Sequence, residues 1–269
     1  LAGGKGLFVK EIEEALLDGR ADLAVHSMKD IPVDLPDGLT LGAVPRRENA
    51  ADVLLSFAFP RLSALPAGAR VGTSSLRRRA QLLDLRPDLN IVPLRGNLDT
   101  RIRKLKAGEC EAVVLAAAGL RRLDLHVPHM DPLSPPTFLP AAGQGALGLE
   151  FRADREDLRE LLAPCNHEPS RICVEAERGF LAGLGAGCQA PVAAYALLSR
   201  DQPDAPLSPQ TPVVLEGLLA SPDGAVLLRR LGRGPAGQAR QLGLDLAEEV
   251  TAAARGTVLE HFLRAGTPP

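Results

Sequence analysis

Residues 25–32, Val-His-Ser-Met-Lys-Asp-Ile-Pro, place a cation beside a carboxylate at the point where an apolar strand ends. The preceding residues 21–25 are predicted to form a short buried strand, and Pro32 prevents a helix from continuing through Asp30. Lys29 and Asp30 are therefore expected on a tight turn at the carboxyl end of a strand, which is where ligands bind in open α/β sheets. The alternative is an ordinary solvated Lys-Asp pair, which contributes little.

The composition is that of a soluble globular protein of two or three domains. The chain has 269 residues, of which 45% are hydrophobic, 24% charged and only 3% aromatic, so the core is expected to consist of Leu, Val and Ala. No apolar run reaches the roughly 18 residues of a membrane span. Because the chain starts at Leu1 rather than Met, we expect further residues, with any targeting segment, to precede it in the native protein.

The cysteines favour a reduced, intracellular protein. None of the four forms a CxxC pair, so neither a zinc site nor a disulfide framework is predicted. Cys188 differs from Cys110, Cys165 and Cys173 because the glycine-rich residues 183–187 precede it, which places it on a flexible loop. That position leaves two alternatives open, a functional thiol or an inert small residue.

Charge is unevenly distributed along the chain. Residues 70–106 contain ten basic and three acidic residues, a net charge of +7, whereas the whole chain carries −2. A local basic surface on an acidic protein indicates a polyanionic ligand of limited size. A nucleic-acid groove is disfavoured, because aromatic residues that stack on bases are absent from the basic segment.

Three successive segments repeat one pattern, a strand, a short turn of small or polar residues and a helix start. They are residues 71–83, 91–105 and 112–122, and their alternation predicts an α/β fold with a mainly parallel sheet. Because parallel strands deliver their loops to the same edge of a sheet, polar side chains from the three units are expected to converge there and bind carboxylates. These side chains are Ser75, Arg77, Arg78, Arg95, Arg101 and Arg122.

The remaining segments complete the predicted order of elements. Lys5 is expected on a mobile glycine-rich loop before a helix over residues 7–18, which stops at Gly19. Gln144 lies between two glycines that permit a hinge or a close backbone approach. Strands are predicted over 39–44, 53–56, 213–219 and 225–231, helices over 155–162, 170–184, 238–254 and 257–264, and a Pro-rich linker or crossover over 127–140.

Six motifs together give the chain a family resemblance. They are His-Ser-Met-Lys-Asp at 26–30, Val-Gly-Thr-Ser-Ser-Leu-Arg-Arg at 71–78, Leu-Arg-Gly-Asn at 94–97 with Thr-Arg at 100–101, Ala-Gly-Leu-Arg-Arg at 118–122, Gly-Gln-Gly-Ala at 143–146, and Gly-Cys-Gln-Ala-Pro at 187–191. In this order and spacing they resemble the porphobilinogen deaminase family, also called hydroxymethylbilane synthases. Each motif alone is weak, but the set spans the whole chain.

The resemblance implies an activity and a fold. Members of the family condense four porphobilinogen molecules head to tail, releasing ammonia, to form the linear tetrapyrrole hydroxymethylbilane. The implied fold is α/β, with two periplasmic-binding-protein-like domains, residues 1–45 plus 146–163 and residues 46–145, and a small C-terminal α/β domain, residues 164–269. The first domain would be incomplete at its N-terminus. A cytoplasmic monomer without nucleic-acid or membrane partners is implied.

The resemblance also implies roles for individual residues. A dipyrromethane cofactor would be attached to Cys188 as a thioether, and Asp30 would be catalytic together with Lys29. Cofactor-binding residues would be Lys5, Ser27, Ser75, Arg77, Arg78, Arg95 and Gly119. Substrate-binding residues would be Arg95, Arg101, Arg122 and Gln144, and no metal is implied.

One departure and one alternative accompany this hypothesis. The family's usual Glu-Gly-Gly-Cys is replaced by Gly185-Ala186-Gly187-Cys188. The competing hypothesis is a non-catalytic two-domain protein that binds a carboxylate-bearing anion through Arg77, Arg78 and Arg95. That hypothesis accounts for the sheet, the hinge and the arginines, but it gives no role to Cys188 or to the Lys29-Asp30 pair.

Overall fold

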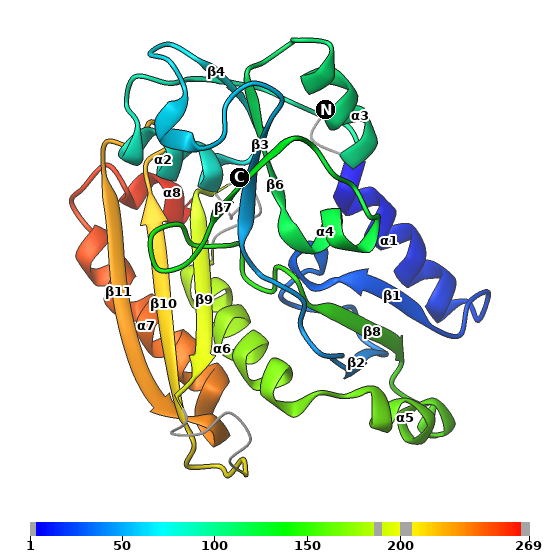
Figure 1. Ribbon diagram of the computed structural model, residues 1–269. Coiled ribbons are helices and arrows are strands. Elements are labelled where there is room, and N and C mark those ends of the chain that lie inside the picture. Colours follow the sequence, from blue (N-terminus) through cyan, green and yellow to red (C-terminus); the bar gives the residue numbers. More distant parts are fainter. Residues whose placement is uncertain (1–3, 186–189, 200–205, 265–269) are drawn as a thin grey trace.

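The computed structural model describes residues 4–185, 190–199 and 206–264, which form three units, each built on its own sheet (Figure 1). The chain builds part of the first unit, passes into the second, and returns to finish the first before it enters the third. In the described residues no helix is both long enough and apolar enough to cross a membrane.

The first unit is a three-stranded sheet in the order β1-β8-β2, and the central β8 runs antiparallel to both neighbours. Leu149 and Phe151 of β8 pack with α5, while Glu150 between them points to the opposite face, because side chains alternate along a strand. Leu16 anchors α1 against the sheet. The elements are α1 (Gly4–Leu17), β1 (Ala24–Ser27), β2 (Leu39–Ala43), β8 (Leu147–Arg152) and α5 (Glu156–Leu162).

The second unit contains the three predicted strand-turn-helix segments, which are β4-α2, β5-α3 and β6-α4. Ser75 and Asn97 cap the first two helices, since their side chains accept hydrogen bonds from the backbone N–H groups of Arg78 and Thr100. The sheet order is β5-β4-β6-β3-β7. Its elements are β3 (Asp52–Ser56), β4 (Arg70–Gly72), α2 (Leu76–Leu85), β5 (Asn90–Val92), α3 (Leu98–Lys106), β6 (Ala112–Ala116), α4 (Ala117–Arg122) and β7 (His129–Leu133).

The prediction of mainly parallel sheets is wrong. Only β4, β5 and β6 run parallel, because helical crossovers join them, whereas β3 pairs antiparallel with both β6 and β7. The first and third sheets are antiparallel throughout their described pairings. The predicted linker at 127–140 also contains a strand, β7, which forms an edge of the second sheet despite its proline. The fold is therefore α/β with mixed sheets.

The third unit is an antiparallel sheet, β11-β10-β9, with two long helices on one face (Figure 1). The helices α6 and α7 approach closely at Gly179 and Gly243, where an added Cβ atom would lie 2.3 Å from the Arg240 carbonyl oxygen and 2.2 Å from that of Ala176. The elements are α6 (Glu168–Leu184), β9 (Val192–Leu198), β10 (Pro212–Ala220), β11 (Leu227–Pro235), α7 (Ala239–Ala254) and α8 (Glu260–Arg264). β10 and β11 pair antiparallel as consecutive strands, which makes them a hairpin.

The two chain segments that cross between the first and second units are fastened to each other and to α6. Arg47 in the first crossing donates from Nε to the Gln144 carbonyl oxygen at 2.9 Å and forms an ion pair with Glu177 at 2.6 Å. The fully buried Glu177 carboxylate also accepts hydrogen bonds from the backbone N–H groups of Gly143 and Ala196. One carboxylate of α6 therefore joins both crossings to the third unit.

Candidate active site

The Lys29-Asp30 pair lies on a tight turn at the end of β1, as the sequence predicts. Met28–Asp30 forms one 3₁₀ turn, closed by a hydrogen bond from the Ile31 N–H group to the Met28 carbonyl oxygen. The strand itself is Ala24–Ser27, later than the predicted 21–25, and Val25 is 59% exposed, so β1 is half-buried rather than buried. Met28 is buried and anchors the turn.

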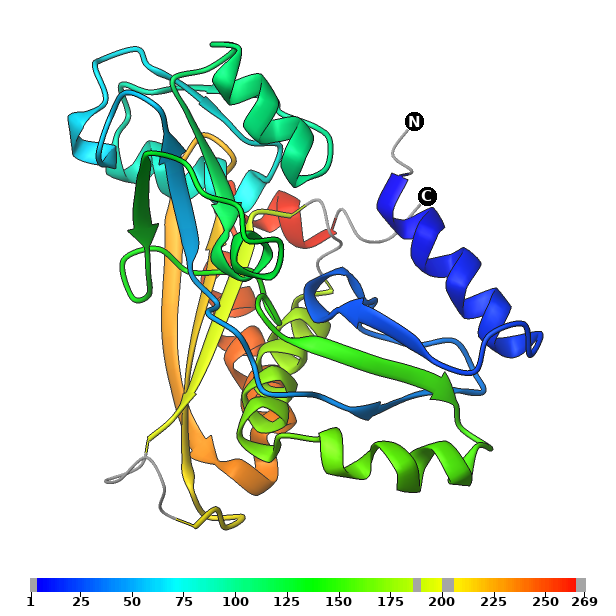
Figure 2. The ribbon, with the colours of Figure 1, turned by 45° about the vertical axis from the view of Figure 1, so that its right-hand side comes forward.

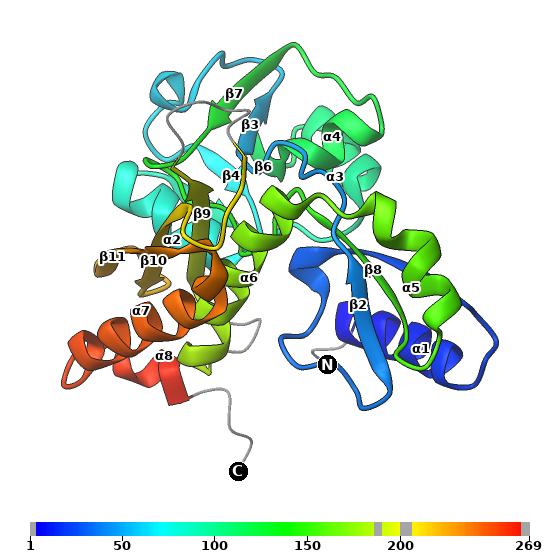
Figure 3. The same cartoon turned by 90° about the horizontal axis from the view of Figure 1, so that it is seen from below.

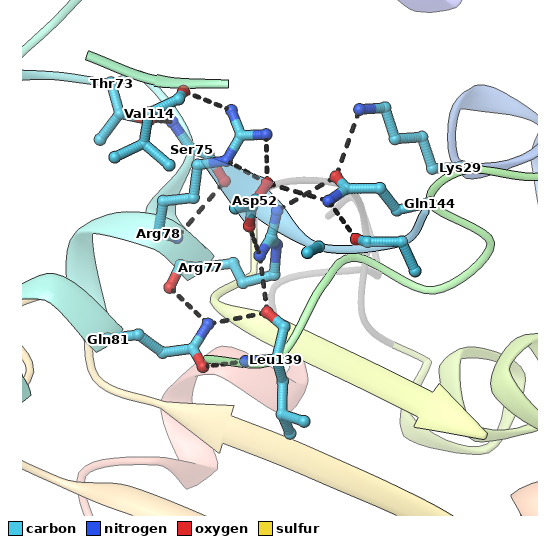
Figure 4. A network of polar contacts seen from close by, with 12 residues as sticks. Lys29, Asp52, Thr73, Ser75, Arg77, Arg78, Gln81, Val114, Leu139 and Gln144 are labelled. Atoms are coloured by element: carbon cyan, nitrogen blue, oxygen red, sulfur yellow. Dashed lines mark hydrogen bonds and ion pairs between the residues drawn. The ribbon is translucent and has the colours of Figure 1, made fainter. Parts of the chain in front are cut away.

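Lys29 extends from this turn into a polar network at the junction with the second unit (Figure 4). Its Nζ atom lies 3.4 Å from Gln144 Oε1, to which it donates. Burial, and then the nearby positive charge of Arg78, lower the pKa of Lys29 from 10.5 to about 7. At neutral pH this amine therefore exists in both protonation states, which suits a group that binds an anion or exchanges a proton.

Arg77 and Arg78 are buried and bind one internal carboxylate, Asp52 (Figure 4). Arg77 Nη1 donates to Asp52 Oδ2 at 2.6 Å, and Arg78 donates to Oδ1 from Nη2 at 2.7 Å and from Nε at 3.1 Å. Burial alone would raise the pKa of Asp52, but the two guanidinium groups outweigh burial and hold that pKa well below 3.8. Two cations and one anion leave an excess positive charge beside Lys29.

Gln144 joins the two sides of this junction. Its side chain is fully buried, and its Nε2 atom donates to the Ala50 carbonyl oxygen at 2.7 Å and to Asp52 Oδ1 at 2.9 Å. These two bonds orient Oε1 toward Lys29 and Arg77, each 3.4 Å away. The predicted glycine pair permits this position, since an added Cβ atom on Gly145 would lie 2.5 Å from the Glu48 carbonyl oxygen.

The other predicted arginines follow strands β5 and β6, one on a loop and two in the helices α3 and α4. Arg95 is exposed on the loop after β5, and no hydrogen bond or ion pair of its side chain occurs within the described ranges. Arg101 is half-buried, with Nε donating to the Gly96 carbonyl oxygen; burial and then Arg78 lower its pKa. Arg122 donates to the Gly145 carbonyl oxygen at 2.8 Å. Arg101 and Arg122 thus adjoin the network, whereas Arg95 extends into solvent.

The remaining predicted residues vary in position. Ser27 ends β1, and Ser75 caps α2. Gly119 allows α4 to approach α3, since an added Cβ atom would lie 2.9 Å from Leu98 Cδ1. Lys5 was predicted on a loop, but α1 begins at Gly4 and includes it, because the helical pattern extends one turn further toward the N-terminus. Cys188 lies outside the described residues.

Asp52 is the main site residue that sequence reasoning missed. It opens the strand β3, all of whose residues are buried. The sequence did contain a signal, because Asp52 directly precedes the apolar residues of a predicted strand. A carboxylate buried at such a position requires cationic partners. Two arginines predicted at one strand end were the complementary signal, but their partner lies about 25 residues earlier in the chain.

A second buried polar cluster lies behind the turn and was also missed. His26 of β1, Glu150 of β8 and Glu13 of α1 are each less than 7% exposed. His26 Nε2 lies 2.8 Å from Glu150 Oε2, although their angle is not that of a hydrogen bond. Burial lowers the pKa of His26 and raises those of both glutamates, which favours uncharged forms. In the described residues no group of three or more His, Cys, Asp or Glu is arranged to hold a metal ion.

A cavity of about 600 Å³ lies elsewhere on the second unit. Its walls include Arg61, Leu62, Arg86, Asp131 and Phe138, and none of the predicted site residues. Arg86 is held there by Asp88 and by two backbone carbonyl groups. A functional site is expected where polar groups converge and pKa values are shifted. Both features are found at the junction with Lys29, so we do not place the site in this cavity.

The junction between the first and second units of this mixed α/β fold carries an excess of positive charge, which favours an anionic ligand. Comparison with known proteins makes this more specific. A family model described as "Porphobilinogen deaminase, dipyromethane cofactor binding domain" matches residues 1–160, and one described as "Porphobilinogen deaminase, C-terminal domain" matches residues 171–252. The chain therefore belongs to the porphobilinogen deaminase family.

Individual relatives agree with this assignment. A porphobilinogen deaminase from Nitratidesulfovibrio vulgaris (strain Miyazaki F) is 59% identical over 98% of this chain and 82% of its own length. One from Chromobacterium violaceum is 53% identical over 92% of this chain and 77% of its own length. Among solved structures, a putative methionine-binding lipoprotein from Bacillus subtilis matches with a TM-score of 0.41 and 14% identity, over 59% of this chain and 75% of that one.

Proposed function

We propose that this chain is a transferase that condenses four porphobilinogen molecules head to tail into hydroxymethylbilane and releases ammonia. The observation that carries the proposal is the Lys29-Asp30 turn, which lies against the buried Arg77-Arg78-Asp52-Gln144 network in a chain of this family. Porphobilinogen carries one acetate and one propionate on its single pyrrole ring. A growing chain of such rings is a polyanion, which fits a cationic junction.

Asp30 is the proposed catalytic carboxylate. Loss of ammonia from porphobilinogen leaves a positive charge that is shared with the ring nitrogen, and a fixed carboxylate beside that N–H group stabilises it. Burial lowers the pKa of both Lys29 and His26, and the negative charge of Asp30 opposes that lowering in each case, so Asp30 acts electrostatically on both groups. A contact at ~4 Å with an effective dielectric constant of ~20 is worth ~4 kcal/mol, roughly a thousandfold in rate.

Lys29 is proposed to bind a substrate carboxylate and to exchange a proton near the departing amine. Its pKa of about 7 places both protonation states within reach at neutral pH. A bound carboxylate favours the ammonium form, so substrate binding is expected to be stronger below this pKa than above it. Gln144 Oε1 fixes the position of the amine in the absence of substrate.

The arginines are proposed to divide their work. Arg95, Arg101 and Arg122 bind carboxylates of the cofactor and substrate, since a planar guanidinium group binds a carboxylate with two hydrogen bonds. Arg77 and Arg78 are proposed to supply positive charge without direct contact with the ligand. In Arg78, Asp52 and one backbone carbonyl group already occupy three of the five N–H groups. Lys5, Ser27, Ser75 and Gly119 are proposed as further cofactor contacts.

The cofactor is dipyrromethane, attached to Cys188 as a thioether. The described residues fit such a group, because an exposed guanidinium group at Arg95 and the pair Lys29-Asp30 provide cations for its carboxylates and a carboxylate for its pyrrole N–H groups. When bound, it supplies the primer to which substrate is added. The chain's own part is to hold that primer's anionic side chains and to place the Asp30 side chain beside the reacting ring.

We also propose a domain organisation. Domain one comprises residues 1–45 and 146–163, domain two comprises 46–145, and domain three comprises 164–269. The first two are proposed to be periplasmic-binding-protein-like, which the double crossing near Arg47 and Gln144 supports. A cytoplasmic monomer is proposed, in keeping with cysteines that lack CxxC spacing.

Incubation with porphobilinogen tests the proposal. The protein should release ammonia, and its intact mass should exceed the sequence mass by two pyrrole units. Cys188→Ala should lose that excess, whereas Cys165→Ala, which removes an exposed thiol, should retain it. Binding of porphobilinogen without release of ammonia would instead support the non-catalytic anion-binding protein.

A further inference from the structure

The turn that carries Asp30 is in contact with α6 of the third unit as well as with its own sheet. In Figures 2 and 3, α6 lies between the third sheet and the first unit. Arg178 of α6 donates from Nη2 to the carbonyl oxygens of Pro32 at 2.6 Å and Val33 at 2.9 Å, and from Nη1 to that of Ile31 at 3.3 Å. One guanidinium group thus binds three consecutive carbonyl groups immediately after Asp30.

Apolar packing supports the same contact. Met28 and Ile31, on either side of the Lys29-Asp30 pair, belong to one buried cluster with Val174 of α6. Val174 and Arg178 are four residues apart, so they lie on the same face of the helix. On the opposite side of the turn, Met28 and Ile31 occupy the space above Gly148, where an added Cβ atom would lie 2.8 Å from Ile31 Cδ1. The turn is therefore held from two sides.

Arg178 is buried, with 8% of the residue exposed. Burial and then the charge of Arg240 lower its pKa, whereas Asp34 and Glu150 oppose that lowering. The carbonyl groups of Ile31, Pro32 and Val33 are the hydrogen-bond acceptors seen for its guanidinium group in the described residues. No carboxylate of the described residues pairs directly with Arg178, and burial of a charged group without such a partner is costly. Such a cost is expected where a residue fixes a backbone position.

The helix α6, which carries Arg178, leads in the sequence toward Cys188. The helix ends at Leu184, six residues or about 9 Å of helix beyond Arg178. Cys188 follows four residues after that end in the sequence. Arg178 thus connects the catalytic turn of the first unit to the helix that leads to the cofactor cysteine.

We propose that Arg178 is a positioning residue, which holds the Asp30 turn at a fixed place relative to α6 while the reaction proceeds. This inference rests on the proposed function, and it adds a role for a residue of the third unit that does not itself touch substrate. A displacement of a catalytic group by about 1 Å costs up to a hundredfold in rate. Loss of the three hydrogen bonds is therefore expected to lower kcat much more than it changes KM.

The test compares Arg178→Gln with Arg171→Gln, which removes an arginine from the surface of the same helix, where Glu168 and Glu175 pair with it. Arg178→Gln should lower kcat about 10- to 100-fold with KM within about threefold, and hydrogen exchange of residues 28–34 should become faster. Arg178→Lys should recover part of kcat, since an ammonium group still donates to carbonyl oxygens. Arg171→Gln should change neither kcat nor the hydrogen exchange of residues 28–34.

The outcomes separate the two proposals. Inactive wild-type protein contradicts the proposed function, whereas active wild-type protein with an unchanged kcat in Arg178→Gln contradicts only the positioning role. A lower kcat in Arg178→Gln without faster exchange in residues 28–34 also contradicts it. If Arg178→Gln does not fold, Arg178→Lys decides, because a kcat and an exchange rate equal to those of the wild type would overturn the inference.

Discussion

The substitution Asp52→Asn isolates the buried charge network beneath the site. The Asp52 carboxylate accepts three hydrogen bonds from Arg77 and Arg78 and one from Gln144, and it is fully buried. The amide keeps the size of the side chain but removes the one negative charge that pairs with these two guanidinium groups in the described part of the chain. Breaking a buried pair in this way costs about 3–5 kcal/mol. For a chain of this size that loss lowers Tm by roughly 6–20 °C.

Thermal unfolding at neutral pH measures this loss, with Asp88→Asn as the control. Asp88 also pairs with an arginine, Arg86, but at the surface, so its substitution should change Tm little. The pKa of Asp52 is lowered in the folded state, so its stabilisation is present above the unfolded value near 4 and is lost as the pH falls through the folded value. A loss below about 1 kcal/mol at pH 7 would refute the reasoning.

Removal of all three charges provides a further comparison. The variant Asp52→Leu with Arg77→Met and Arg78→Met removes the three charges of these ion pairs together. Replacement of a buried ion network by apolar residues of similar volume is often neutral or stabilising. The triple variant should therefore be more stable than Asp52→Asn, although it should lose activity if the network supplies the positive charge of the site. A triple variant less stable than Asp52→Asn would show that shape, rather than charge, dominates at this position.

Three further predictions concern Lys29, Gly145 and Arg95. The KM for porphobilinogen should rise as the pH increases through about 7, because Lys29 loses its charge there. Lys29→Arg should abolish this inflection in KM, whereas an unchanged pH profile in that variant would show that another group causes the inflection. Gly145→Ala should lower the free energy of unfolding by about 1 kcal/mol more than Gly108→Ala does. Both glycines have positive φ, but of the two only Gly145 faces a backbone oxygen. Equal losses of unfolding free energy in urea titrations would exclude the close contact as the cause. Arg95→Leu should weaken substrate binding by ~1.5–3 kcal/mol without changing Tm. Arg86→Leu should leave KM unchanged, because Asp88 and backbone carbonyl groups hold Arg86 elsewhere. Equal effects of the two variants on KM would indicate that the basic residues act only through their combined electrostatic field.

Local patterns predicted the elements near the site because their signals lie close together in the sequence. The turn after β1, the capped helices after β4 and β5, and the close approach at Gly145 each follow from a few neighbouring residues. The strand directions did not follow, because they depend on how the chain crosses between units. The strand β8 returns to the first sheet between β1 and β2, more than 100 residues after β2, and no local pattern records that return.

The contacts of the site residues were less predictable than their positions. The sequence predicted Arg77 and Arg78 just after a strand, and both lie in the first turn of α2 after β4, but their guanidinium groups were expected to be available to a ligand. Their partner Asp52 lies on a strand that enters the sheet from the first unit. The contact of Arg178 with residues 31–33 spans about 145 residues of sequence and required the fold itself.

The most direct test of the account is single-turnover release of ammonia from porphobilinogen by Asp30→Asn. The amide keeps the size of the side chain but removes the charge that stabilises the cationic pyrrole, so porphobilinogen should still bind while turnover falls about 10²- to 10³-fold, the scale of one lost electrostatic contact. Asp30→Glu keeps the charge at a shifted position and should retain more activity. Ammonia release by Asp30→Asn at close to the wild-type rate would contradict the assignment of Asp30 as the catalytic carboxylate.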